Sequence, residues 1–210
     1  MSRPPCPGRK GGSVSSVLFF LSAAFLTLIS FGVQEFLPEI TWAYGAKFIL
    51  PTTIFLAAAV TVSYPFMLML AFLVGFVWDA RHLSFTSGIA ETSGMVMGTG
   101  ELAFGYSILL FGFAGSIMQG IRPLFGRGRF ELPVLMIGIV TGLWLLLEYL
   151  LLVFRRGNPV FPESLWMKIG STSLLAVLIS PIILFILHKL AQVTHYEIRY
   201  EGLSRRGYGR

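Results

Sequence analysis

Charged residues and cysteine are both scarce in this sequence. Of its 210 residues only 12% are charged, and one is a cysteine, Cys6. A single cysteine excludes an intramolecular disulfide and a cage of thiolates around a metal ion. Cys6 precedes the first apolar run, whereas the acceptor cysteine of a lipoprotein follows such a run.

Catalytic signals are also scarce. The three histidines, His82, His188 and His195, are scattered, and no third ligand stands near the last two. The chain has no HExxH, no GxSxG, no phosphate-binding loop and no close carboxylate pair within an apolar run. We therefore expect no enzymatic activity, no catalytic residue, no cofactor and no metal site.

Hydrophobic residues are abundant, at 55% of the chain, and the mean hydropathy is +0.76. A water-soluble domain does not sustain such values. Because a transmembrane helix needs about 20 apolar residues, a chain of this length has room for one bundle of six helices. The composition thus predicts an all-α, polytopic integral membrane protein.

Six apolar runs are the predicted spans. They cover approximately residues 17–36, 48–63, 66–78, 103–121, 133–154 and 169–191. The first run is longer than the apolar region of a signal peptide, about 7–15 residues, so we expect it to be retained. Tyr64 and Pro65 between the second and third runs favour a tight reversal, since proline disfavours helix before it; one kinked helix, and hence five spans, is the alternative.

The remaining segments are read from their composition. Residues 1–13 form a basic leader rich in proline and glycine, residues 14–192 the membrane domain, and residues 193–210 a basic tail. The glycines between residues 80 and 102 predict a flexible loop on the outer side.

The positive-inside rule sets the expected orientation. With both termini in the cytoplasm, 11 of the 16 lysines and arginines lie on the inner side. The outer side then has Lys47, Arg81, Arg155, Arg156 and Lys168. The net charge of +6 comes from residues beside spans and not from a basic patch interleaved with aromatics, so we expect a lipid bilayer and no nucleic acid as the partner of these charges.

Two acidic residues are candidates for a site. Asp79 ends the third run beside Trp78, where a helix-end acid at the lipid boundary is an equally simple interpretation. Glu148 lies six residues before Phe154, about 9 Å from the outer end of its span at 1.5 Å per residue. A charge at that depth is costly, so Glu148 should either pair with Arg155 or face a cavity or a partner.

Small residues recur every four positions on two runs. The fourth run has Gly112, Ser116 and Gly120, and the fifth has Gly138 and Gly142. Such rows let helix backbones approach closely, either within the protein or against a partner helix. Internal packing is the default expectation.

Several short strings together resemble one known family. They are Gly-Phe-Val-Trp-Asp at 75–79, Gly105-Tyr106, Phe-Gly-Phe-Ala-Gly at 111–115 and Leu-Glu-Tyr at 147–149. Over residues 15–192 the chain resembles MreD, the bacterial rod-shape-determining membrane protein. It departs from the family in the long connection between Asp79 and Gly105, where Gly88 is the candidate for the glycine that usually follows the aspartate more closely.

The resemblance implies a six-helix fold similar to the substrate-binding subunits of energy-coupling-factor vitamin transporters, used as a non-enzymatic scaffold in the bacterial cytoplasmic (inner) membrane. It implies that the protein binds MreC and couples the MreB cytoskeleton to the elongation-type peptidoglycan synthases, a transpeptidase and a SEDS-family glycosyltransferase, in rod-shape maintenance. It puts Asp79 and Glu148, with their neighbours Trp78 and Tyr149, at an outward-facing cavity or partner contact, and Gly75 among the packing glycines.

Two other functions use the same residues. A solute-binding subunit of an energy-coupling-factor type transporter would have the same fold, but the first run lacks the spaced alanine pair, Ala-x-x-x-Ala, with which such subunits dock. A small membrane enzyme acting on a lipid headgroup would need two cooperating polar residues at one depth, and only Asp79 with Glu148 supplies them.

Overall fold

The computed structural model describes residues 12–38, 40, 45–93, 105–122, 131–156, 163–194 and 196, without the side chains of 12, 13, 82–93, 155 and 156. Within these residues the chain forms six helices. They are α1 (Gly12–Phe36), α2 (Leu50–Thr61), α3 (Tyr64–Ser93), α4 (Tyr106–Ile121), α5 (Glu131–Arg156) and α6 (Glu163–Val193). The all-α prediction is confirmed for this part of the chain.

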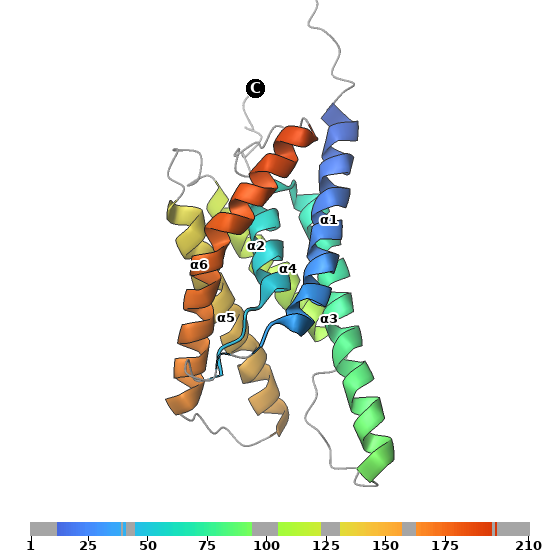
Figure 1. The fold of residues 1–210 in the computed structure, drawn as a ribbon, viewed down its shortest axis with the longest axis vertical. Coiled ribbons are helices and arrows are strands. Elements are labelled where there is room, and N and C mark those ends of the chain that lie inside the picture. The colour runs from blue at the N-terminus through green and yellow to red at the C-terminus, as the bar shows by residue number, and fades with distance from the viewer. Residues whose placement is uncertain are drawn as a thin grey trace, which may run out of the picture.

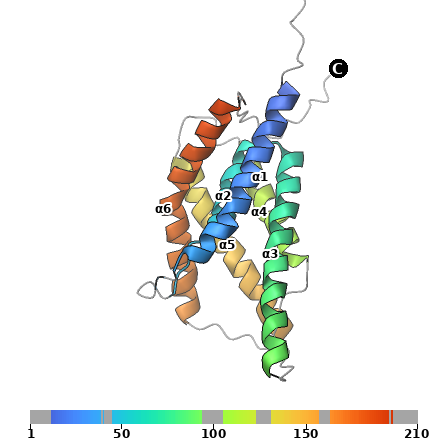
Figure 2. The same cartoon turned by 45° about the vertical axis from the view of Figure 1, so that its right-hand side comes forward.

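The helices run alternately up and down, so that the start of α1 and the end of α6 lie at the same end of the bundle (Figures 1 and 2). We call this the termini end. The end of α1, the start of α2 and the start of α6 lie toward the opposite end, which we call the cavity end for the feature described below.

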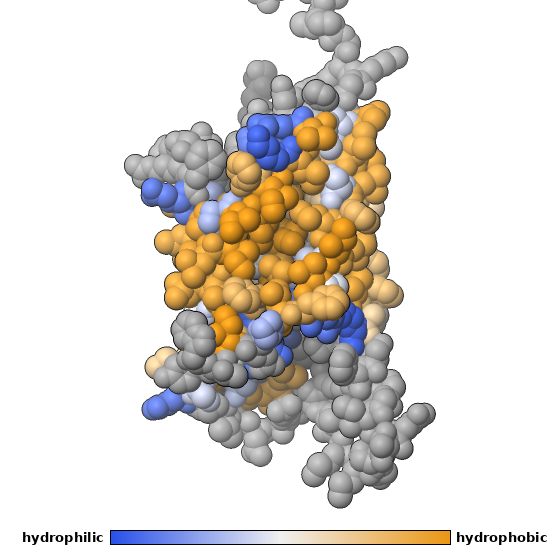
Figure 3. All heavy atoms as spheres, viewed as in Figure 1, coloured by the Kyte–Doolittle hydropathy of each residue, from blue (hydrophilic) through white to orange (hydrophobic). Residues whose placement is uncertain are grey.

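Four helices are long and apolar enough to cross a membrane. Their apolar spans are Val14–Phe36, Tyr64–Arg81, Glu131–Phe154 and Glu163–Val193. Figure 3 displays the result as an apolar band around the bundle with hydrophilic residues above and below it. Large apolar side chains such as Leu109 and Leu178 point outward from this band, 71% and 62% exposed. The protein is therefore a multi-pass membrane protein.

The short helix α2 is the core of the bundle. Every residue from Pro51 to Thr61 is buried, and α2 contacts each of the other five helices. A helix that is apolar all round can be stable only where it is enclosed. Its 12 residues span about 18 Å, less than the ~30 Å of a hydrocarbon core, so α2 is too short to cross a membrane by itself.

The last carbonyls of α2 find their donors on α4 and just beyond it. Gln119 Nε2 donates to the carbonyl oxygens of Ala59 (2.6 Å) and Val62 (2.8 Å). Arg122 donates to Val62 at 3.1 Å and to Thr61 at 3.3 Å. Since a helix leaves its final carbonyls without partners, these two buried side chains replace the water that the interior lacks.

Tyr196, just beyond α6, adds a third donor at the same place. Its hydroxyl donates to the carbonyl of Thr61 at 3.3 Å, and its ring stacks on Phe19 of α1 at 4.6 Å between centroids. The end of α2 thus joins α1, α4 and the segment after α6.

The predicted reversal between the second and third runs is confirmed. Helix α2 ends at Thr61 and α3 begins at Tyr64, with Pro65 in the first turn of α3, where a missing N–H costs nothing. Six helices, not five, are therefore present in the described chain.

The predicted loop over residues 80–102 is wrong for its first part. Helix α3 continues to Ser93, while residues 94–102 lie outside the described chain. A glycine such as Gly88 costs a helix only about 1 kcal/mol, and no proline interrupts residues 66–93, so the change from apolar to polar residues does not end the helix.

Candidate functional site

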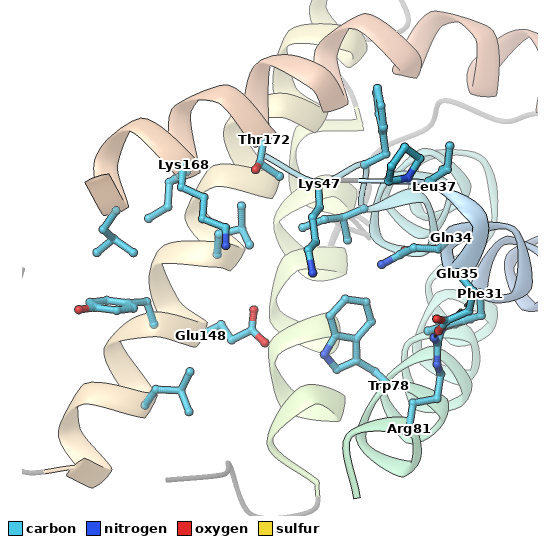
Figure 4. A pocket seen from close by; sticks show the side chains of 18 residues that line it. Phe31, Gln34, Glu35, Leu37, Lys47, Trp78, Arg81, Glu148, Lys168 and Thr172 are labelled. Carbon is cyan, nitrogen blue, oxygen red and sulfur yellow. Dashed lines mark hydrogen bonds and ion pairs between the residues drawn. The ribbon is translucent and has the colours of Figure 1, made fainter. Parts of the chain in front are cut away.

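A cavity of about 860 Å³ lies at the cavity end of the bundle. Its lining comes from α1, the segment before α2, α3, α5 and α6 (Figure 4). Because α2 starts only at Leu50, the chain before it leaves room that a full-length span would fill. The shortness of the core helix therefore creates the cavity.

Glu148 of α5 faces this cavity, together with Tyr149 and two leucines, Leu145 and Leu152. The four positions follow the spacing i, i+3, i+4, i+7, which puts them on one helix face. The indole N–H of Trp78, from α3, donates a hydrogen bond to the Glu148 carboxylate, and Figure 4 displays the two groups facing each other. Glu148 is therefore oriented by a residue of another helix.

Two lysines share the cavity with Glu148. Lys47 comes from the segment before α2 and Lys168 from the first turns of α6, and both ammonium groups extend toward the space beside Glu148 (Figure 4). Their attraction lowers the cost of keeping a carboxylate at this depth. The alternative pairing of Glu148 with Arg155 involves a side chain outside the described set.

An ion pair closes one side of the cavity. Arg81 of α3 pairs with Glu35 of α1 and also donates to the carbonyl of Phe31 at 3.2 Å. Its guanidinium lies 5.5 Å from the centre of the Phe31 ring, within range of a cation–π interaction. These contacts hold the end of α1 against α3.

Gln34 adds an acceptor to the lining. Its amide oxygen is buried and accepts no hydrogen bond from any residue that the structure describes. A buried amide oxygen without a donor costs about 1–3 kcal/mol, so this position favours a group that donates to it.

Asp79 has a different position from Glu148. It is buried, at 7% exposure, and is not part of the cavity lining. Its Oδ2 accepts a hydrogen bond of 2.7 Å from the backbone N–H of Gly105, the residue that precedes α4. Gly105 has a φ of +105°, which glycine adopts without strain. Asp79 therefore holds the N-cap residue of α4, and its charge is favourable near the positive end of that helix.

Aromatic rings separate the cavity from the core. Trp78 makes edge-to-face contacts with Trp144 (5.2 Å) and Phe111 (5.9 Å), and Phe111 in turn meets Phe55 of α2 at 5.2 Å. The ring of Trp78 thus has Glu148 and the Phe31 ring as neighbours in the cavity lining, and an apolar cluster behind it.

The small residues do not all pack inside the protein. Gly75 of α3 lies against α4, where an added Cβ would be 2.5 Å from the Cα of Ile108. Gly138 and Gly142 face α6, and Ser173 of α6 donates to the Gly138 carbonyl at 2.6 Å.

The row of small residues on α4 does not face another helix of the described structure. An added Cβ at Gly112 or Gly120 meets no described atom within 4 Å, and the Ser116 hydroxyl bonds back to the Gly112 carbonyl of its own helix. The rows on α4 and α5 therefore do not meet, because α5 turns its glycines toward α6.

Sequence reasoning identified Glu148, Trp78 and Tyr149, all of which line the cavity, and Asp79, which does not. It considered Lys47 and Lys168 only as basic residues on the outer side of the membrane, and it assigned no role to Gln34. The spacing of Leu165, Lys168, Ile169 and Thr172 on one face of α6 was a usable signal, since this face also lines the cavity.

Among the described residues, no group of three histidine, cysteine, aspartate or glutamate side chains is placed to hold a metal ion. No family model, curated protein or solved structure matches the chain.

Proposed function

We propose that this protein is a non-enzymatic membrane scaffold of the MreD kind, which binds MreC and couples the MreB cytoskeleton to peptidoglycan synthesis at the bacterial inner membrane. The observation that supports the proposal is that the short sequence motifs on which the resemblance rests contact one another in the structure. Asp79 binds the N–H of Gly105, 26 positions later, and Trp78 donates to Glu148.

A second support is the different surroundings of the two acidic residues, Asp79 and Glu148. An enzyme acting on lipid headgroups would need Asp79 and Glu148 to cooperate in one open space. Asp79 is instead buried and accepts a hydrogen bond from a backbone amide, so that of these two acids only Glu148 lines the cavity. This division of roles favours a scaffold.

The test is purification of the tagged protein from its native membrane in mild detergent, followed by mass spectrometry of the proteins that remain bound. We expect MreC and the elongation synthases. Glu148→Leu should reduce the recovery of MreC and disturb cell shape while membrane insertion stays normal. Glu163→Leu, at the exposed start of α6, is the matched control. Unchanged recovery of MreC in Glu148→Leu removes Glu148 from the interface, and absence of MreC from the wild type overturns the proposal.

One observation favours a second candidate, a solute-binding subunit of an energy-coupling-factor type transporter. The cavity of about 860 Å³ lies within the range of about 300–1,000 Å³ typical of ligand sites. The same purification separates the two, because a transporter subunit should bring an ATPase module with it in place of MreC.

A further inference from the structure

Several hydrogen-bonding groups of the cavity lining are not used within the described protein. Thr172 of α6 is buried, at 3% exposure, and its hydroxyl makes no hydrogen bond within the part of the chain that the structure describes. Lys168, one turn earlier on α6, makes no ion pair or hydrogen bond with the described residues either. The Gln34 amide of α1 extends toward the same space, and no described residue donates to its oxygen (Figure 4). Water or a ligand therefore completes these groups.

The charged groups of the lining have both signs. The Glu148 carboxylate offers about four acceptor positions, one of which accepts from the Trp78 indole. Lys168 adds an ammonium, which only donates, while Lys47 already interacts within the protein. Glu148 repels an anion and Lys168 repels a cation. A neutral ligand avoids both repulsions and the cost of moving a further charge out of water.

Hydroxyl groups suit this mixed lining, because a hydroxyl both donates and accepts. One hydroxyl donates to Glu148 and another accepts from Lys168, as the waters that they displace would do. A ring holds several hydroxyls at fixed distances, so it loses little conformational entropy when it binds. The cavity volume of about 860 Å³ accommodates a sugar of one or two rings.

We propose that the cavity binds a neutral sugar of one or two rings. Its hydroxyls donate to Glu148 and accept from Lys168 and Gln34, while the Thr172 hydroxyl bonds to the same ring from α6. The sugar is either free in solution or the headgroup of a glycolipid, since both present the same hydroxyls. The proposal goes beyond the scaffold function and does not depend on it, because it concerns only the cavity.

The test is isothermal titration of the purified full-length protein in an amine-oxide detergent, which has no sugar headgroup of its own. The sugar probes are glucose, galactose, mannose and maltose. The comparison probes are triethylene glycol, inorganic phosphate, ethylammonium and glycine, which are neutral, anionic, cationic and zwitterionic. We expect at least one sugar to bind saturably with a Kd of about 1 mM or tighter, and each comparison probe to bind at least about tenfold more weakly.

Two glycosides of the tightest sugar distinguish its source. The methyl glycoside has almost no alkyl portion, whereas the hexyl glycoside, used below its micelle concentration, resembles a glycolipid headgroup with the start of its chain. Equal affinities identify a free sugar, and tighter binding of the hexyl glycoside identifies a glycolipid.

Variants connect the binding to the cavity. Lys168→Met should weaken binding of the tightest sugar about tenfold, because a hydrogen bond to a charged group is lost, and Thr172→Val about threefold. The matched controls are Lys189→Met on α6 and Thr141→Val on α5, both outside the cavity lining, and they should bind like the wild type.

Lys168 is exposed, so its replacement leaves the fold intact and remains informative if Thr172→Val is unstable. The proposal is overturned by the absence of saturable binding of every sugar, or by a comparison probe that binds as tightly as the tightest sugar. Wild-type affinity of Lys168→Met for that sugar overturns it as well.

Discussion

At the residue scale, the close contact between α3 and α4 depends on the glycine at position 75, because glycine has no side chain to hold the two helices apart. Gly75 lies so close to α4 that a Cβ at this position would meet the backbone N of Ile108 at 2.6 Å as well as its Cα. Backbone atoms cannot rotate away as a side chain can. A methyl group at this position would therefore force one of the two helices to move away from the other.

Gly75→Ala tests this contact. We expect the free energy of unfolding to fall by about 1–3 kcal/mol, as for other overpacked sites. The melting temperature should then fall by about 2–4 °C for each kcal/mol lost. The measurement is thermal unfolding in detergent. Gly32→Ala on α1 is the matched control, because its Cβ would meet nothing within 4 Å and alanine favours a helix by about 1 kcal/mol. Equal melting temperatures for the two variants would contradict the close contact.

The two acids also differ at this scale. In the sequence, Asp79 and Glu148 are both carboxylates near the ends of apolar runs, and nothing local separates a cap from a cavity residue. The difference comes from their partners: the Gly105 N–H for Asp79, and the Trp78 indole with the shared space of two lysines for Glu148.

At the scale of the element, α2 has the unusual position of a short helix enclosed by five others. The last residues of α2 are buried, so its final carbonyls have no access to water. Gln119 and Arg122 satisfy them instead, so these two polar residues of the apolar interior are structural and are not candidates for a site.

Removing these donors should destabilise the bundle. Gln119→Leu leaves the carbonyls of Ala59 and Val62 with fewer donors, at a cost of about 1–3 kcal/mol, and Arg122→Met should cost a similar amount. The measurement is melting temperature and folded yield in detergent. Lys189→Met is the control, since its ammonium only lies 5.7 Å from the Phe185 ring near the end of α6. Stability equal to that of the control would mean that water, not Gln119, serves these carbonyls.

At the scale of the whole molecule, the bundle is organised by its apolar band and by the alternation of helix directions. The start of α1 and the end of α6 share the termini end, while the cavity is at the opposite end. A ligand in the cavity and any group bound to the termini end would therefore meet opposite faces of the membrane.

Cysteine labelling tests this arrangement. In a Cys6→Ser background, single cysteines at Val14 and Val193, which are 63% and 76% exposed, should react with an impermeant maleimide from the same side of the membrane. A cysteine at Lys168 should react only from the other side, because α6 crosses between the two positions. Labelling of Val14→Cys and Val193→Cys from opposite sides would contradict the six-helix topology.

The sequence by itself determined the class of the protein and most of its elements. A helix that crosses a bilayer needs a long apolar run, and such a run is visible in the sequence itself. The six runs and the break at Pro65 could therefore be found without coordinates. The continuation of α3 to Ser93 was missed, because the glycines of that segment suggest a loop while helix formation tolerates them at small cost.

Only the tertiary structure decided which polar residues share a site. The cavity lining draws on five segments of the chain, and their side chains meet through the packing of helices around α2, which no local pattern encodes. Lys47, Lys168 and Gln34 belong with Glu148 for that reason, while Asp79 belongs to the cap of α4. A bilayer selects for hydrophobicity along the chain, but the positions of charges relative to one another depend on helix rotation, which packing alone fixes.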